Sequence, residues 1–72
     1  MDELALLSTV ALLEDIPEKP LRRGQVGTVV ETLSQGVYEI EFSDDSGQTY
    51  ASIALSGSRL LPLFHGPAIR AA

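Results

Sequence analysis

The single histidine is the side chain best suited to acid–base or metal chemistry, because imidazole titrates near neutral pH. His65 lies between Phe64 and Gly66, and the 72 residues contain no cysteine to share a metal with it. A catalytic histidine needs an activated nucleophile beside it, and no serine lies in a G-x-S-x-G elbow. We therefore predict no catalytic residue, no bound metal and no cofactor. We interpret His65 as a solvated or lightly packed side chain.

Two acidic residues offer the next candidate, a cation site. Asp44 and Asp45, flanked by serines, carry the hard oxygen atoms that Ca²⁺ and Mg²⁺ prefer. The stretch lacks the spaced acidic positions and the final glutamate of a calcium-binding loop. Aspartate, serine and glycine are also typical of turns, so we interpret residues 43–47 as a hairpin turn.

Three glutamates are predicted to share an outward surface. Glu31, Glu39 and Glu41 would lie together if strands at residues 28–33 and 37–42 pair antiparallel. Acid–base work by paired carboxylates needs a cleft that raises one pKa, and so short a chain offers little depth. Acidic faces commonly keep a sheet soluble and protect its edges. Solubility is the favoured interpretation, and a functional acidic face is the alternative.

The two glycines of Gly24-Gln25-Val26-Gly27 suggest a phosphate-binding loop only superficially. The further glycine, the lysine and the following helix of such loops are missing. Glycine can take φ > 0 or let another backbone approach closely, and the Thr-Val-Val run that follows favours a strand. Gly24 and Gly27 are therefore predicted to form a structural turn that opens a strand.

Length and charge limit the elements that can position these residues. The chain is expected to form one domain, residues 1–72, and ten acidic against five basic residues give a formal net charge of −5. Such a charge repels phosphate backbones and anionic membranes, so neither partner is expected. Asp2 and Glu3 occupy the place of a signal peptide's basic region, and no run approaches the ~20 apolar residues of a membrane helix. We expect a cytoplasmic location.

Alternating and β-branched residues predict an all-β chain of about five short strands. The clearest alternation places Tyr38, Ile40 and Phe42 on a core face, with the intervening glutamates facing outward. Residues 7–63 are the predicted core and residues 64–72 a flexible tail. The predicted elements are a helical turn or extended lead-in at 2–6, strands at 9–13, 28–33, 37–42, 48–55 and 59–63, a hairpin connection at 34–36 and a 3₁₀ turn at 56–58.

This order of strand, long loop, three-strand meander, short turn and final strand is that of a small SH3-like barrel. Residues 23–31, Arg-Gly-Gln-Val-Gly-Thr-Val-Val-Glu, resemble the start of a KOW-type unit, in which a glycine-bearing turn leads into a Thr-Val strand. More broadly, residues 12–17, 21–31, 38–42 and 47–51 resemble a family of short bacterial proteins catalogued as a domain of unknown function. The resemblance covers residues 7–63. It implies an SH3-like fold and a bacterial or cyanobacterial source, where such proteins are often encoded beside other short genes, as toxins and antitoxins are. It implies no activity, substrate or site residues.

Residues 14–23 contain two prolines, which fix φ and disfavour helix, so they predict a long charged loop. In SH3-like barrels the corresponding loop borders a peptide-binding groove. The predicted partner-binding residues here are Pro17, Pro20, Leu21, Arg22 and Arg23. The chain lacks the tryptophan and exposed aromatics of polyproline recognition. The alternative is that Ile16 and Leu21 fold into the core. The two arginines would then pair with the acidic residues of the loop, Glu14, Asp15 or Glu18.

The N-terminal run carries more leucine than one side of a first strand can bury. Leu4, Leu6 and Leu7 therefore either cap the open end of the barrel or meet a partner. We favour capping for some of them and include all three in the predicted partner-binding set. A homo-oligomer is the alternative cover.

Small size, acidity, surplus leucines and the missing catalytic set favour a non-enzymatic protein-binding module. An antitoxin-like or accessory subunit, with a protein partner whose identity is open, fits this description. The alternative is a KOW-like nucleic-acid (RNA) binding protein, supported by the KOW-like segment and by Arg22-Arg23. An enzyme is the least favoured class.

Overall fold

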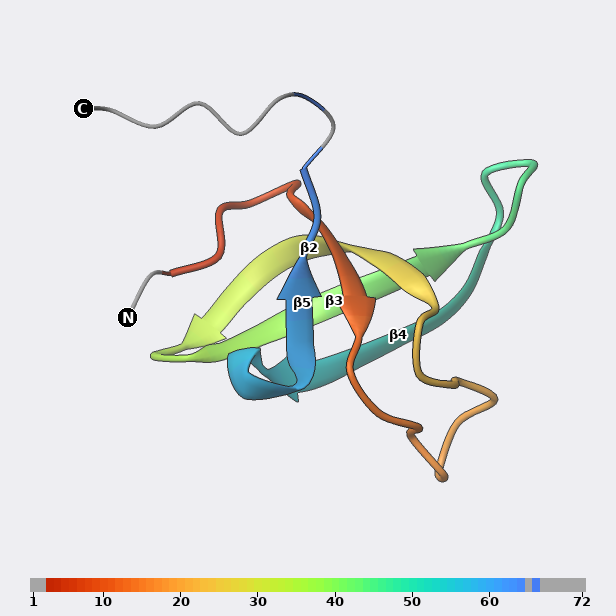
Figure 1. Cartoon of the computed structure of the whole chain (residues 1–72), viewed down its shortest axis with the longest axis horizontal. Coiled ribbons are helices and arrows are strands. Elements are labelled where there is room, and N and C mark those ends of the chain that lie inside the picture. Colours follow the sequence, from red (N-terminus) through yellow and green to blue (C-terminus); the bar gives the residue numbers. More distant parts are fainter. Residues whose placement is uncertain (1–2, 65, 67–72) are drawn as a thin grey trace.

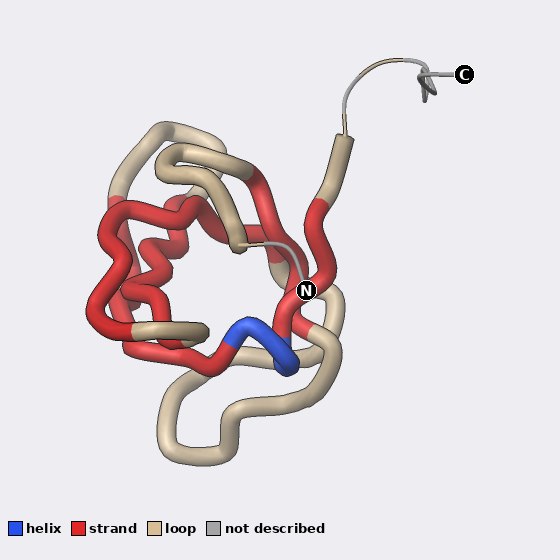
Figure 2. The backbone as a smooth tube through the Cα atoms, turned by 90° about the vertical axis from the view of Figure 1, so that its left-hand side faces the viewer, coloured by secondary structure: helices blue, strands red, loops and turns tan. Residues whose placement is uncertain are grey.

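A computed structural model describes residues 3–64 and residue 66. Its elements are β1 (Thr9–Leu12), β2 (Val26–Ser34), β3 (Val37–Ser43), β4 (Thr49–Ser56), a 3₁₀ helix η1 (Gly57–Arg59) and β5 (Leu60–Pro62). The strands form one antiparallel sheet in the order β4-β3-β2-β1-β5 (Figure 1). Seen from the side, the backbone of this sheet curls around an interior (Figure 2). The core side chains meet in that interior. The prediction of an all-β, five-stranded, barrel-like fold is confirmed.

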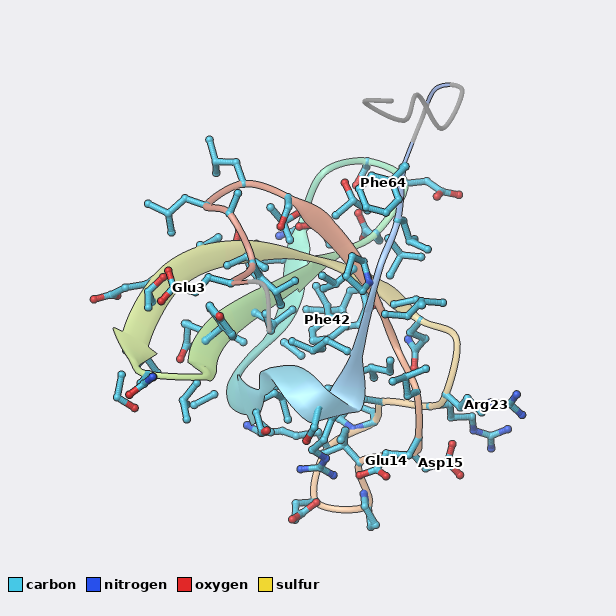
Figure 3. The ribbon with its side chains drawn as sticks, turned by 60° about the vertical axis from the view of Figure 1, so that its left-hand side comes forward. Glu3, Glu14, Asp15, Arg23, Phe42 and Phe64 are labelled. Carbon is cyan, nitrogen blue, oxygen red and sulfur yellow. The ribbon has the colours of Figure 1, made fainter. Side chains whose placement is uncertain are left out.

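The core is built on the alternation of β3. Tyr38, Ile40 and Phe42 are buried, and Ile40 and Phe42 are 0% exposed. Phe42 lies inside the curled sheet, whereas Phe64 lies outside it (Figure 3). A strand places successive side chains on opposite faces, so the glutamates between these residues remain only partly buried. The side chains that meet in this core are Val10, Leu12, Ile16, Leu21, Val29, Tyr38, Ile40, Phe42, Leu55 and Leu60.

The two glycines before β2 have different roles. Gly24 takes φ +93° in the turn that precedes β2, a conformation that L side chains rarely adopt. Gly27 lies within β2 and pairs with Val10 of β1. A Cβ atom on Gly27 would lie 2.7 Å from Ile40 Cγ2 and 2.9 Å from Phe42 Cε2. The second glycine is therefore required by close packing inside the barrel, and β2 begins before it, at Val26.

The N-terminal lead-in contains a turn rather than a helix, so the helical alternative is not formed among residues 3–8. The N–H of Ser8 donates to Ala5 O at 3.2 Å, and the Ser8 hydroxyl donates to the same oxygen at 2.7 Å. We call residues 5–8 the N-terminal turn. Leu7 within it takes φ +67° and donates its N–H to Val29 O at 2.6 Å.

The C-terminal elements follow the prediction closely. The 3₁₀ helix forms after Ser56, whose side chain accepts a hydrogen bond from the N–H of Ser58. β5 is an edge strand that contains Pro62, as expected of a residue without an N–H. The predicted tail lies almost wholly outside the described residues, as does His65. The described part of the chain contains no helix with the length and apolarity to cross a bilayer.

Candidate functional site

The connection from β1 to β2, residues 13–25, is here called the proline loop. It is anchored by Ile16 and Leu21, which form an isolated β-bridge and are 1% and 2% exposed. The N–H of Ile16 donates to Leu21 O at 3.0 Å, and the N–H of Lys19 donates to Ile16 O at 3.1 Å. These two apolar side chains join the core, as the alternative interpretation of the loop proposed. The residues between them project as a tight tip.

The second half of the proline loop is a turn fixed by one side chain. The N–H of Gln25 donates to Arg22 O at 3.0 Å, and the carbonyl oxygen of the Gln25 side chain accepts from the N–H of Arg22. The Gln25 amide nitrogen then donates to the Tyr50 hydroxyl at 3.0 Å. Gly24 supplies the positive φ of the turn and donates to Leu12 O at 2.8 Å. The turn is thereby tied to both β1 and β4.

The acidic residues at the base of the loop have other partners than the arginines' side chains. Glu14 Oε2 lies 2.6 Å from Arg59 Nε, which joins the loop to η1. Asp15 Oδ1 accepts from the backbone N–H of Arg23 at 2.8 Å. Among the described residues the ion pair formed is Glu14–Arg59, so the alternative in which the Arg22 or Arg23 side chain pairs with a carboxylate of the loop is not formed.

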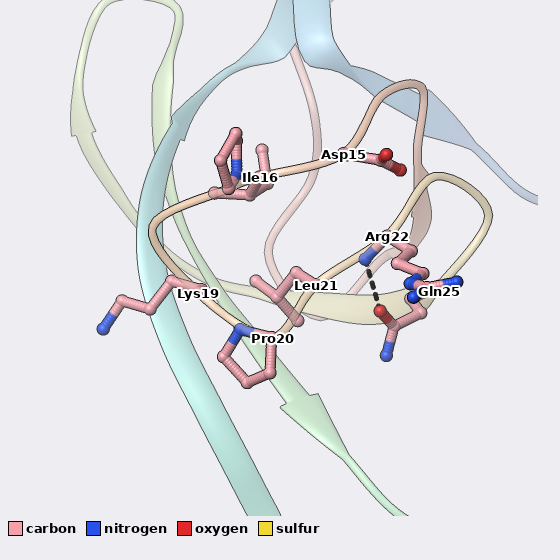
Figure 4. Close-up of a pocket in the computed structure, with 8 residues that line it drawn as sticks. Asp15, Ile16, Lys19, Pro20, Leu21, Arg22 and Gln25 are labelled. Carbon is pink, nitrogen blue, oxygen red and sulfur yellow. Dashed lines mark hydrogen bonds between the residues drawn. The ribbon is translucent and has the colours of Figure 1, made fainter.

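A hollow of about 640 Å³ opens in the proline loop (Figure 4). Its apolar part comes from the two prolines, with the buried anchors behind them, and its polar part comes from charged and amide side chains. The residues that line it are Asp15, Ile16, Pro17, Lys19, Pro20, Leu21, Arg22 and Gln25. Four of the predicted partner-binding residues thus come together, and Arg23 follows directly in the chain.

Basic and acidic side chains both lie around this hollow. Lys19, Arg22 and Arg23 are exposed, and they are three of the five basic residues of the chain. Arg59 is paired with Glu14. The loop also contains Glu14, Asp15 and Glu18, so its three basic and three acidic residues cancel, and the formal net charge of −5 lies on the rest of the chain. An arginine fork binds carboxylates and phosphates in a bidentate manner, so Arg22 offers the hollow an anion-binding group, and the Asp15 carboxylate lines the same hollow.

Comparison with known proteins identifies the family of this chain. A family model described as "Domain of unknown function (DUF4926)" matches residues 6–62. The chain belongs to this family. Searches of curated proteins and of solved structures each returned no match. For this member of the DUF4926 family, the matched segment runs from the N-terminal turn to Pro62, the last residue of β5, and so includes the whole proline loop.

The N-terminal leucines lie at the opposite end of the DUF4926 domain from the proline loop (Figure 1). Leu4 packs against the core and donates its N–H to the Tyr38 hydroxyl at 3.1 Å. Leu6 and Leu7 are 60% and 75% exposed. Leu4 therefore covers one end of the barrel, while the other two point away from it. The structure does not bring the leucines and the proline loop into one surface.

The carboxylates considered as cation ligands have structural partners. Asp44 Oδ1 accepts from the N–H and the hydroxyl of Ser46 and from the N–H of Gln48, at 2.8–3.0 Å. The Ser46 hydroxyl is the largest of the causes that lower the pKa of Asp44, followed by the Gln48 N–H. Residues 3–64 and 66 contain no cluster of three or more metal-ligating side chains. Residues 44–48 form the hairpin turn.

Four residues that line the hollow were not among the predicted partner-binding residues: Asp15, Ile16, Lys19 and Gln25. Lys19 lines the hollow, and its position between the two prolines of the predicted binding loop could have indicated this role. Gln25 organises the turn through Tyr50, and this contact joins residues 25 positions apart. No local pattern in the sequence indicates such a contact.

Proposed function

We propose that the chain is a non-enzymatic protein-binding module whose proline loop binds an acidic peptide segment of a partner. The observation that carries the proposal is the gathering of Lys19, Arg22 and Arg23 around a partly apolar hollow. The loop is formally neutral and the rest of the chain carries the net charge of −5, so a partner with carboxylates is repelled less at this loop than elsewhere and can pair with its exposed cations.

The wall chemistry favours a peptide over other anions. Pro17 and Pro20 offer rigid apolar surface that loses little conformational entropy on binding. Gln25 holds the N–H of Arg22, so the cationic turn is ordered before a partner arrives. Three exposed cations match a short acidic stretch, whereas a longer phosphate backbone would also meet the acidic remainder of the surface.

The wider setting belongs to the same proposal. The order of strand, long loop, three-strand meander, 3₁₀ helix and strand supports an SH3-like barrel, with the proline loop beside a peptide groove. A bacterial protein in the cytoplasm, acting as an accessory or antitoxin-like subunit, fits a small acidic chain that binds through one arginine-bearing loop. The KOW-like segment, residues 23–31, begins in the last three residues of this loop and continues into β2.

Site-specific photo-cross-linking tests the proposal. Benzoylphenylalanine placed at Glu18, at the exposed tip of the loop, is expected to give a discrete protein adduct in an extract of the source organism. The double variant Arg22→Glu, Arg23→Glu should abolish the adduct, because it reverses the charge of the turn. Mass spectrometry of the adduct should find an acidic segment at the cross-link.

The matched control places the same probe at Ser34, which is exposed at the far end of β2. Equal adducts from both positions, or an adduct that survives the charge reversal, would contradict the proposal. An adduct that disappears on ribonuclease treatment would instead favour the nucleic-acid alternative.

A further inference from the structure

The two edges of the sheet differ in how they are protected from pairing with another strand. β5, at one edge, has three residues and ends in Pro62. β4, at the other edge, has eight residues, Thr-Tyr-Ala-Ser-Ile-Ala-Leu-Ser, with no proline and no charge. Natural edges are normally blunted by shortness, by proline, by bulges or by charged side chains. β4 shows a register shift at its start, opposite Phe42 and Ser43, and is regular from Ala51 onward.

The free backbone groups of β4 can be assigned. The N–H of Gly57 donates to Gly36 O at 2.9 Å, directly after the pairing of Ser56 with Val37. Hydrogen-bonded and non-bonded pairs alternate in an antiparallel ladder. Leu55 and Ile53 therefore bond to β3, while the N–H and C=O groups of Ser52 and Ala54 point to the open edge. Because β4 ends the strand order, no strand of the described residues lies beside these groups.

The core is also incomplete along this edge. Ile40 and Phe42 of β3 are fully buried, whereas their β4 partners Ile53 and Ala51 face the same core and remain partly exposed. The outward side chains, Ser52, Ala54 and Ser56, are small and uncharged. An added strand could thus approach without a steric or charge barrier, and it would extend the cover over the partly exposed core residues.

We propose that β4 pairs antiparallel with β4 of a second copy of this chain, about a two-fold axis perpendicular to the sheet. A second copy is the occupant that matches the edge: it offers the same eight-residue length, whereas β5 of another copy would satisfy only part of β4. If Ala54 of one copy lies opposite Ala54 or Ser52 of the other, the unpaired N–H and C=O groups of the two edges face one another. Both core faces then lie on the same side of a ten-stranded sheet.

Charge supports the same choice. Each copy carries a formal net charge of −5, so two copies can approach closely only where carboxylates are absent. β4 has none, and the nearest in the sheet, Glu39 and Glu41, lie one strand behind it on β3. One of them, Glu39, accepts a hydrogen bond from the Ser52 hydroxyl. Added salt should therefore strengthen the pairing. This dimer uses a surface other than the proline loop, and it stands or fails independently of the proposed peptide binding.

Sedimentation of the full chain from micromolar to millimolar concentration tests the proposal. The expected result is a species of twice the 7.7 kDa of one chain, with amide exchange at Ser52 and Ala54 slowing by an order of magnitude or more as it forms. Ala54→Pro removes an N–H that faces the open edge and should give a folded monomer by circular dichroism. If Ala54→Pro does not fold, Ser52→Pro replaces it. The amide-exchange measurement is made on the unchanged chain and so does not depend on either variant.

The matched control is Leu61→Lys on the protected edge strand, where the side chain is exposed on the outer face. It should leave the dimer intact. A chain that stays monomeric at millimolar concentration overturns the proposal. So does a dimer that Leu61→Lys disrupts and Ala54→Pro does not, because its interface would then be the apolar outer face of β1 and β5.

Discussion

The proline loop and the N-terminal turn both expose groups suited to binding, but they are constructed differently. The proline loop places a glycine at its positive φ and sinks two apolar side chains into the core. The N-terminal turn places Leu7 at φ +67° and leaves Leu6 and Leu7 in solvent. Left-handed backbone is strained for a residue with a Cβ atom. The proline loop is thus anchored in the core with a relaxed backbone. The N-terminal turn has a strained backbone that neighbouring strands hold in place.

The strongest test of this contrast truncates one leucine in each region. Leu21→Ala should lower the free energy of unfolding by about 2–5 kcal/mol, because it leaves a cavity in the core. Leu6→Ala, at a side chain already in water, should change it by less than about 0.5 kcal/mol. Urea denaturation of both variants measures the difference. Equal losses would mean that the proline loop is not anchored through Leu21, or that Leu6 is covered in solution.

The second test removes the relaxed conformation of the proline loop. A Cβ atom added at Gly24 would have no other atom within 4 Å. The cost of Gly24→Ala is therefore only that of holding alanine at φ +93°. The expected loss of unfolding free energy is about 1–2 kcal/mol. Gly66→Ala is the control, since open space also surrounds Gly66 and its φ is not in the positive range. If Gly24→Ala lost no more unfolding free energy than Gly66→Ala, the turn would have adopted another backbone conformation at little cost in free energy.

How far the sequence predicts these regions depends on the range of the interactions. The alternation of β3, the hairpin turns and the 3₁₀ helix follow from local residue types, and the structure agrees with them. Gln25 is different, because its partner Tyr50 comes from another strand. The strain at Leu7 is likewise imposed from outside, through hydrogen bonds of Leu7 and Ser8 with Val29. Tertiary contacts of this kind leave no periodic signal in a single sequence.

The third test relieves the strain in the N-terminal turn. Leu7→Gly should raise the free energy of unfolding by up to about 1 kcal/mol, because glycine takes φ +67° without a Cβ clash. The gain is partly offset by the greater freedom of glycine in the unfolded chain. Leu6→Gly, in the same turn but without a positive φ, should be destabilising. A loss of stability in Leu7→Gly would indicate that the Leu7 side chain makes contacts in solution that outweigh its strain.

The smallest expected effect concerns the ion pair at the base of the proline loop. The Arg59 and Glu14 side chains are 33% and 56% exposed, so solvent and salt screen their attraction. Glu14→Gln should therefore cost at most about 1 kcal/mol of unfolding free energy at low salt, and less as salt rises. The buried anchors, rather than this pair, would then account for the stability of the loop. If the loss instead matched that of Leu21→Ala and persisted in high salt, the anchoring of the loop would have to be assigned to Glu14 and Arg59.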